Sequence, residues 1–223
     1  MNPLVVMIFA GILLLVPAGQ AAAGSKITVH GIYMVPYGND AKEVSRPGWG
    51  LGAGFVTALP GAREIINGSA GLEFINLMSN TVDEAAAVEG VILPYTKDTD
   101  QWYARLRLGG QLGGLGDGFF RPYVGLNAAL VLYAIDTDLD FHPGGGAEDF
   151  TKHAYDDIDA VFGYDVTAGA DLNVSDKISV DGGVKYLRSI SVPDQLGGGS
   201  ERIYPEYFQI HLGIGFTLLT ADL

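Results

Sequence analysis

An alternation of apolar and polar residues with a period of two runs through most of the chain and restricts its fold more than any other feature. In the clearest segment, Gln101 to Leu112, one side of the chain carries Trp102, Ala104, Leu106, Leu108 and Leu112. The other side carries Tyr103, Arg105, Arg107, Gly109 and Gln111. A period of two is typical of a β-strand with one apolar face. Similar segments occur at Ile27–Val35, Trp49–Leu59, Ala70–Met78, Val124–Leu132, Phe162–Leu172, Ile178–Tyr186 and Phe208–Leu218.

These segments predict eight strands, and an even number of alternating segments of this length is typical of a membrane-spanning barrel. Hydrophobic residues make up 48% of the chain and charged residues only 17%, yet after the N-terminus no apolar run is long enough for a spanning helix. A sheet in hydrocarbon must close so that no backbone group is left unpaired. We therefore predict an all-β fold, an eight-stranded antiparallel up-and-down transmembrane β-barrel formed by residues 24–223 as one domain.

The connections between the predicted strands alternate between long and short, which favours a membrane barrel over a soluble one. Long extracellular loops and short periplasmic turns are typical of such barrels, and an even number of strands then leaves both termini in the periplasm. The long connections are Tyr37–Pro47, Ser79–Asp100, Asp136–Asp157 and Ser191–Tyr204, and the shorter ones are Pro60–Gly68, Gly113–Phe119 and Val174–Asp176.

Polarity changes along one face of the fifth strand in the way expected where a strand leaves a bilayer. The even-numbered face is apolar from Val124 to Ala134 and then continues as Asp136, Asp138 and Asp140. A carboxylate facing lipid is costly, whereas one at headgroup level is not. Aromatic residues near strand ends are placed for interfacial girdles; they are Trp49, Trp102, Phe119, Phe120, Tyr186 and Phe208.

The N-terminus has the features of a secretory signal peptide. An apolar run from Leu4 to Val16 ends at Pro17, and Ala21 to Ala23 supply the small residues of a cleavage site. We expect residues 1–23 to be removed, leaving Gly24 as the mature start; a retained anchor helix is the alternative. The chain has no cysteine, which excludes disulfides and thiolate sites. Its net charge of −13 argues against a nucleic-acid partner.

The polar face of the strands predicts a network of charges inside the barrel. An unpaired charge in a closed, narrow lumen is costly, so these residues should pair. A three-residue turn at Val174–Asp176 places Asp165 opposite Lys185, and we predict that cross-strand pair. The network either plugs the lumen, which we favour, or lines a continuous polar conduit. Its expected members are Glu73, Arg105, Arg107, Asp165, Asp171, Asp181, Lys185 and His211, with His30 on the same face.

The segment from Asp136 to Asp159 is strongly acidic and offers possible cation contacts at Asp136, Asp138 and Asp140. It lacks the Gly and terminal Glu of an EF-hand loop at the required offsets. We expect a solvated loop that shares divalent cations with lipopolysaccharide; a specific metal site is the alternative. We expect no metal centre or cofactor. Nor do we expect an enzyme, because no serine, histidine and acid converge in a defensible catalytic pattern.

The chain resembles the eight-stranded outer-membrane barrels of the OmpA membrane-domain and OmpW type. The resemblance rests on the leader, on Phe-Arg-Pro-Tyr-Val-Gly at Phe120–Gly125 and on the closing strand around Gly213–Phe216, and covers nearly all of the mature chain. It implies a bacterial outer-membrane location, contact with outer-membrane lipid and lipopolysaccharide, and handling by the barrel-insertion machinery, in a protein that we expect to be monomeric.

Three functions remain open at this point. The first is a structural role or passive passage of small, mainly hydrophobic solutes, which the resemblance implies. The second is a surface-binding or adhesin-like role of the long acidic loops. The third is a soluble ligand-binding barrel of lipocalin type, in which the apolar rows would line a cavity.

Overall fold

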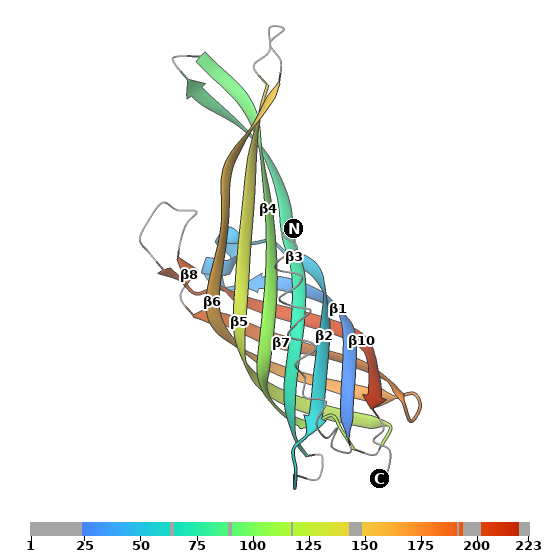
Figure 1. The fold of residues 1–223 in the computed structure, drawn as a ribbon. Helices are drawn as coiled ribbons and strands as arrows, with labels where there is room; N and C mark the ends of the chain where they lie inside the picture. Colours follow the sequence, from blue (N-terminus) through green and yellow to red (C-terminus); the bar gives the residue numbers. More distant parts are fainter. Residues whose placement is uncertain are drawn as a thin grey trace.

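The structure, a computed structural model, describes residues 24–62, 65–88, 91–116, 118–142, 149–190, 192–193 and 202–218. Its main feature is a closed barrel in the order β1-β10-β7-β6-β5-β4-β3-β2, with all neighbouring strands antiparallel (Figure 1). The predicted fold class is therefore confirmed. The barrel strands are β1 (Ser25–Tyr37), β2 (Gly48–Ala58), β3 (Ile66–Val88), β4 (Val91–Gly113), β5 (Phe120–Phe141), β6 (Phe150–Asn173), β7 (Ile178–Ile190) and β10 (Glu206–Leu218).

Three small elements lie between barrel strands. The helix α2 (Gly38–Val44) connects β1 to β2, and β8 (Val192–Pro193) pairs with β9 (Arg202–Ile203) between β7 and β10. Within the described ranges, no helix has the length and apolar character needed to cross a membrane.

The two ends of the barrel differ in their connections. Ser25 pairs with Leu218, so the first and last described strand residues lie at one end, which we call the terminal end. The turns β2–β3, β4–β5 and β6–β7 also lie there, and the segments that join β1 to β2, β3 to β4, β5 to β6 and β7 to β10 lie at the opposite end, which we call the extension end (Figure 1). The segments predicted as long connections therefore lie at one end, but Ser79–Asp100 is not a long loop, since β3 and β4 pair as far as Val88 and Val91. The predicted signal peptide, residues 1–23, lies outside the described residues.

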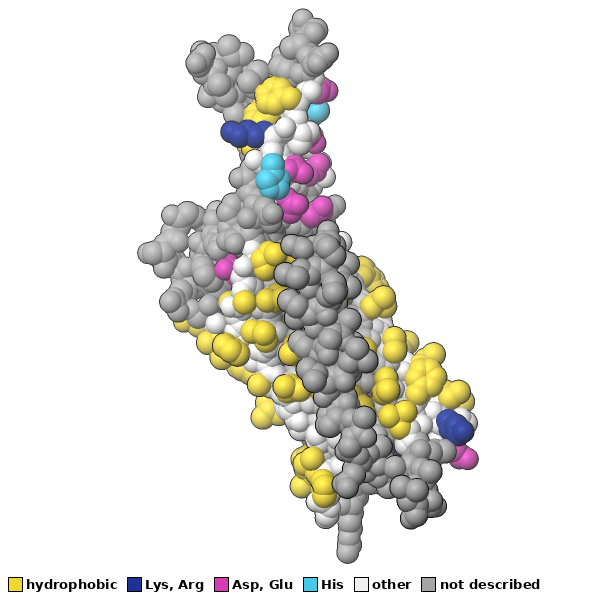
Figure 2. All heavy atoms as spheres, in the orientation of Figure 1, with side chains coloured by type: hydrophobic (Ala, Val, Ile, Leu, Met, Phe, Trp, Pro, Cys, Tyr) yellow, Lys and Arg dark blue, Asp and Glu magenta, His cyan; other side chains and the backbone are white. Residues whose placement is uncertain are grey.

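The apolar rows face outward, as the alternation predicts for a membrane barrel. Leu126 is 62% exposed and Val166 48%, whereas the neighbouring polar Asp165 is fully buried inside the lumen. Figure 2 shows hydrophobic side chains spread over the barrel exterior. The lipocalin-type alternative requires these rows to point inward, and the structure therefore contradicts it.

The aromatic residues expected in girdles lie on the outside near the strand ends. Trp49 packs against Tyr33 with ring centroids 4.5 Å apart, and Phe208 packs against Tyr37 at 4.8 Å. Toward the extension end the barrel surface carries Trp49, Trp102, Tyr186 and Phe208, and at the terminal end it carries Phe119 and Phe120.

Four strands continue well past the barrel rim, which corrects the prediction of two long loops. Pairing of β3 with β4 runs to Val88 and Val91, and pairing of β5 with β6 runs to Phe141 and Phe150. The segments Ser79–Asp100 and Asp136–Asp157 are therefore mostly strand. Their β-branched residues, among them Thr81, Thr96, Thr99 and Thr137, favour an extended backbone even where acidic residues interrupt the apolar rows.

The extension begins where the flanking strands stop pairing. Pairing of β2 with β3 ends at Asn76, and pairing of β6 with β7 begins only at Phe162. A β-bulge at Leu77 lies at this level, in agreement with the enrichment of bulges at barrel rims. We call the parts of β3, β4, β5 and β6 beyond this level the extension; Figure 1 shows it projecting from the barrel.

The outward orientation predicts a depth-dependent cost for charge on the barrel exterior. We expect Leu126→Arg to lower the free energy of unfolding from lipid vesicles by about 2–4 kcal/mol, because the guanidinium would face hydrocarbon. The matched change Val174→Arg, in an exposed turn at the terminal end, should alter it by less than about 1 kcal/mol. Equal effects in equilibrium denaturation would contradict the membrane placement of β5.

Candidate functional site

The centre of the lumen is organised around one carboxylate, Glu73 on β3. Arg105 on β4 forms an ion pair and a hydrogen bond with its Oε2. The Nζ of Lys185, which comes from β7 across the barrel, lies 2.5 Å from Oε1. Arg107 Nε and His30 Nε2 each lie 3.5 Å from the same Oε1. One buried carboxylate therefore holds three cationic side chains.

A second carboxylate, Asp165 on β6, completes this central cluster. Its Oδ2 lies 3.6 Å from Arg105 Nη1, and its Oδ1 accepts hydrogen bonds from Asn127 Nδ2 at 2.7 Å and Thr167 Oγ1 at 3.0 Å. Arg105 also donates to Gln209 Oε1 at 3.1 Å. We call Glu73, Arg105, Arg107, Asp165 and Lys185 the central cluster.

A separate group of charges lies nearer the terminal end. Lys26 Nζ lies 3.1 Å from Asp171 Oδ1 and 3.6 Å from Asp181 Oδ2, and Arg121 forms an ion pair with Asp171. His211 Nε2 lies 3.2 Å from Asp181 Oδ1. We call Lys26, Arg121, Asp171 and Asp181 the terminal cluster.

The predicted pair between Asp165 and Lys185 is wrong. Asn173 pairs with Ser179, so Lys185 lies opposite Thr167 and Asp165 lies opposite Leu187. Five residues, Val174–Ile178, lie between the paired Asn173 and Ser179, two more than the predicted three-residue turn, and the register shifts by two. Lys185 therefore remains in the lumen, as predicted, but reaches across it to Glu73.

The structure brings all eight predicted lumen residues into these two clusters or into direct contact with them, and adds several that the sequence analysis did not select. Lys26 follows the same alternation as His30 on β1, and Arg121 the same alternation as Asn127 on β5, so the period of two could have identified both. Tyr123 contacts His211 Nε2 at 3.0 Å through its hydroxyl. Predicting that contact requires the register of the strands, which the alternation alone does not give.

Glycines on the lumen face make room for the clusters. A Cβ at Gly71 would lie 2.6 Å from Arg107 Nε, and one at Gly52 would lie 2.4 Å from His30 Nε2. Both distances are far below ordinary van der Waals contact, so these side chains occupy the space that larger residues would fill.

An apolar layer lies in the lumen between the central cluster and the extension end. Tyr103 and Tyr207 pack with ring centroids 6.1 Å apart, and Tyr133 packs on Tyr103 at 5.1 Å. Ala41 of α2 is part of the same layer and is fully buried. The layer comprises Ile32, Met34, Ala41, Ile75, Leu77, Tyr103, Ala129, Val131, Val161, Leu187 and Tyr207.

The extension carries acidic residues on one face. Asp98 lies directly opposite Asp138, and Asp100 lies directly opposite Asp136, across the β4–β5 pair. Paired residues of adjacent strands project to the same side, and this side continues the lipid-facing surface of β4 and β5. We call Asp83, Asp98, Asp100, Asp136, Asp138 and Asp140 the acidic face; Figure 2 shows carboxylate and histidine side chains along the extension.

Asp136, Asp138 and His153 have the ligand types and spacing to hold a metal ion, since one ligand atom of each lies within 4.8 Å of the others. His153 Nδ1 is 2.8 Å from Asp138 Oδ1 and 3.4 Å from Asp136 Oδ1. Asp140 accepts a hydrogen bond from Thr151 at 2.5 Å and lies on the same face. The three predicted cation contacts therefore share one surface, and His153 Nδ1 contacts two of them.

Comparison with known families agrees with the barrel geometry. The family model of the outer membrane protein beta-barrel domain matches residues 8–216. The chain belongs to this family. Membership implies that the protein resides in a bacterial outer membrane. A search among curated proteins gave no significant match.

Solved structures include barrels of the same kind. Neisserial surface protein A (NspA) aligns with a TM-score of 0.56 at 11% identity, covering 86% of this chain and 96% of the other. OprG from Pseudomonas aeruginosa aligns at 0.48 and 12% identity, covering 91% of this chain and 99% of the other. At such identities the likeness to NspA shows the fold alone, and the weaker alignment with OprG adds no argument.

The central cluster predicts a large stability loss when its shared carboxylate is neutralised. We expect Glu73→Gln to lower the free energy of unfolding by about 3–5 kcal/mol, because buried cations would lose their partner. Asp100→Asn, the analogous change at an exposed position opposite Asp136, should change it by no more than about 0.5 kcal/mol. Urea denaturation in detergent micelles measures both, and similar midpoints for the two variants would contradict the proposed importance of Glu73.

Proposed function

We propose that this protein is a non-conducting outer-membrane anchor that presents its extension at the cell surface, where the acidic face binds divalent cations shared with lipopolysaccharide. The observation that carries the proposal is the combination of a lumen closed by an apolar layer with four strands that continue beyond the rim. It corresponds to the surface-binding function rather than to passage of solutes.

The lumen offers no continuous polar route through the part of the barrel that the structure describes. The charged clusters end at the apolar layer, where Ile75, Tyr103 and Tyr207 are at most 1% exposed. A cavity of about 20 Å³ lies among the charged residues. That volume is comparable to the roughly 10–15 Å³ needed by one water molecule, so it cannot hold an organic solute.

The orientation in the membrane follows from the asymmetry of the ends. Short turns at the terminal end are typical of the periplasmic side, and long projections of the extracellular side. We therefore assign both termini to the periplasm and the extension to the exterior. The acidic face then rises directly from the lipid-facing surface, at the level where lipopolysaccharide phosphates and their counterions lie.

The acidic face is suited to such counterions by its charge arrangement. Asp98 lies directly opposite Asp138, and Asp100 lies directly opposite Asp136. Like charges in directly opposite positions destabilise a sheet. Divalent cations relieve this repulsion and bridge carboxylates to phosphates, both of which are hard oxygen ligands.

We assign no enzymatic role, because both lumen histidines are buried in ion-paired surroundings away from the surface.

A closed lumen predicts an absence of conductance. Purified protein inserted into planar bilayers should give no stable single-channel currents, and proteoliposomes should not swell in small sugars or amino acids. A general porin reconstituted in parallel is the positive control. Reproducible channels with the protein would contradict the anchor function and favour solute passage instead.

Surface binding is tested with lipopolysaccharide. Protein in nanodiscs should bind lipopolysaccharide micelles in the presence of Mg²⁺ and release them in EDTA, as measured by surface plasmon resonance. The triple change Asp98→Asn, Asp136→Asn and Asp138→Asn should remove most of the Mg²⁺-dependent signal. Asp176→Asn, an exposed change at the terminal end, is the control and should leave the signal intact. Binding that is indifferent to EDTA or to the triple change would refute this assignment.

A further inference from the structure

The polar half of the lumen carries an excess of positive charge. Between the apolar layer and the terminal end, the described lumen residues include five cations, Lys26, Arg105, Arg107, Arg121 and Lys185, and four carboxylates, Glu73, Asp165, Asp171 and Asp181. The terminal cluster is balanced, with two of each. The central cluster has three cations and two carboxylates, so the excess charge lies there.

Arg107 is the least firmly held cation of the central cluster. Its Nε lies 3.5 Å from Glu73 Oε1, and within the described part of the chain this is its one ion pair. The Nε is buried without a hydrogen-bond partner there. By contrast, Lys185 approaches the same oxygen to 2.5 Å, and Arg105 contacts both Glu73 and Asp165. The Arg107 side chain is 12% exposed, and a largely enclosed guanidinium with so little compensation is costly unless another negative group is nearby.

A cavity lies beside Arg107. It has a volume of about 20 Å³ and is lined by nitrogen-bearing side chains from several strands, including Lys26, His30, Arg107, Lys185 and His211. His30 and His211 are at most 4% exposed, and the Nδ1 atoms of both lack a hydrogen-bond partner among the described residues. These are polar groups without a partner at the wall of a small space within the lumen.

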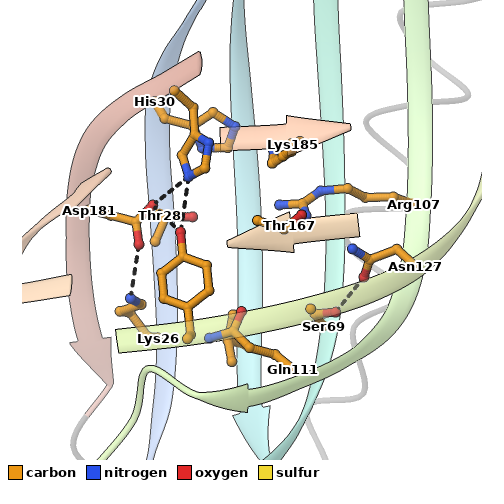
Figure 3. Close-up of a pocket in the computed structure, with 14 residues that line it drawn as sticks. Lys26, Thr28, His30, Ser69, Arg107, Gln111, Asn127, Thr167, Asp181 and Lys185 are labelled. Carbon is orange, nitrogen blue, oxygen red and sulfur yellow. Dashed lines mark hydrogen bonds and ion pairs between the residues drawn. The ribbon is translucent and has the colours of Figure 1, made fainter. Parts of the chain in front are cut away.

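The carboxylate at the cavity wall is already engaged. Asp181 is held by Lys26, by His211 and by the hydroxyl of Tyr123, which donates to it at 3.2 Å. In Figure 3, Asp181 and Lys26 lie toward one side of the cavity, and Arg107 and Lys185 lie toward the other. The excess positive charge therefore lies on the side of the cavity away from Asp181.

We propose that this cavity is a binding site for one monatomic inorganic anion of the chloride class, held between Arg107 and Lys185. The bound anion compensates the excess charge of the central cluster and accepts hydrogen bonds from N–H groups, such as Arg107 Nε, that otherwise lack a partner among the described residues. The volume of about 20 Å³ matches one species of about the size of water, which favours a monatomic ion over phosphate, sulfate and carboxylates. This function is independent of binding at the acidic face.

The direct test replaces chloride by bromide, which is located by its anomalous scattering. Crystals of the protein refolded and grown in sodium bromide should show an anomalous peak in contact with the Arg107 guanidinium and Lys185 Nζ. Ordinary water density without an anomalous signal at this position overturns the proposal. A peak of the same height in Arg107→Gln also overturns it, because it would mark an adventitious ion only.

A solution measurement tests the same site through linkage, since a ligand that binds only the folded state stabilises it. The urea midpoint of the wild-type protein in micelles should be higher in sodium chloride than in sodium gluconate at equal ionic strength. Arg107→Gln should abolish this difference. The control Lys97→Gln, which removes a positive charge from the extension, should retain it. An anion-independent midpoint in the wild type, or loss of the difference in both variants, counts against the site.

If Arg107→Gln does not fold, Lys185→Gln provides the second variant, and the bromide experiment on the wild type remains decisive alone. In Lys185→Gln the central cluster becomes neutral, and the expected result is again loss of the anomalous peak and of the chloride effect on the midpoint. Persistence of both would refute the proposal.

Discussion

The pairing of β1 with β10 closes the sheet, and the positions of nearly all side chains follow from this closure. In hydrocarbon the backbone tolerates no free edge, so every wall strand must have two neighbours. Once the ring is closed, successive residues point alternately to lipid and to lumen. Leu126 and Asp165 thus reach opposite environments because successive residues alternate between the two faces, and Glu73, Arg105, Asp165 and Lys185 are confined to a narrow interior.

That interior is divided into two parts with different physical character. The half toward the terminal end holds charges that depend on one another, and Glu73 links strands β1, β3, β4 and β7 through its partners. The half toward the extension end is apolar and aromatic. The first part fixes the relative positions of distant strands, and the second is the layer that we propose makes the barrel non-conducting. Both stabilise the barrel, and neither favours transport.

The sequence predicts the fold and the sorting of faces because a period of two is a local property. Glu73, Arg105, Asp165 and Lys185 were assigned to the lumen from their neighbours alone. Their partners were not predictable in the same way, since pairing depends on register and on which strands face each other across the ring. Two extra residues between the paired ends of β6 and β7 were enough to separate Asp165 from Lys185.

The prediction of loops where the extension lies was wrong for a related reason, since strand pairing is not a local property. Aspartate is disfavoured in strands, and its frequency in this region resembled that of a solvated loop. The cross-strand pairs that maintain the strands, such as Phe141 with Phe150, become visible only when both partners are aligned. The one-sided placement of Asp136, Asp138 and Asp140 was nevertheless predicted, because it needs only an extended backbone.

The continuity of the extension with the wall has a consequence for how this surface can change during evolution. Each hairpin of the extension can grow or shrink by two residues per strand and keep its carboxylates on the same side. A change of one residue per strand would turn everything beyond it to the opposite side, unless a bulge such as that at Leu77 restores the phase. Length variation in related chains should therefore occur in even steps, or be accompanied by a compensating bulge.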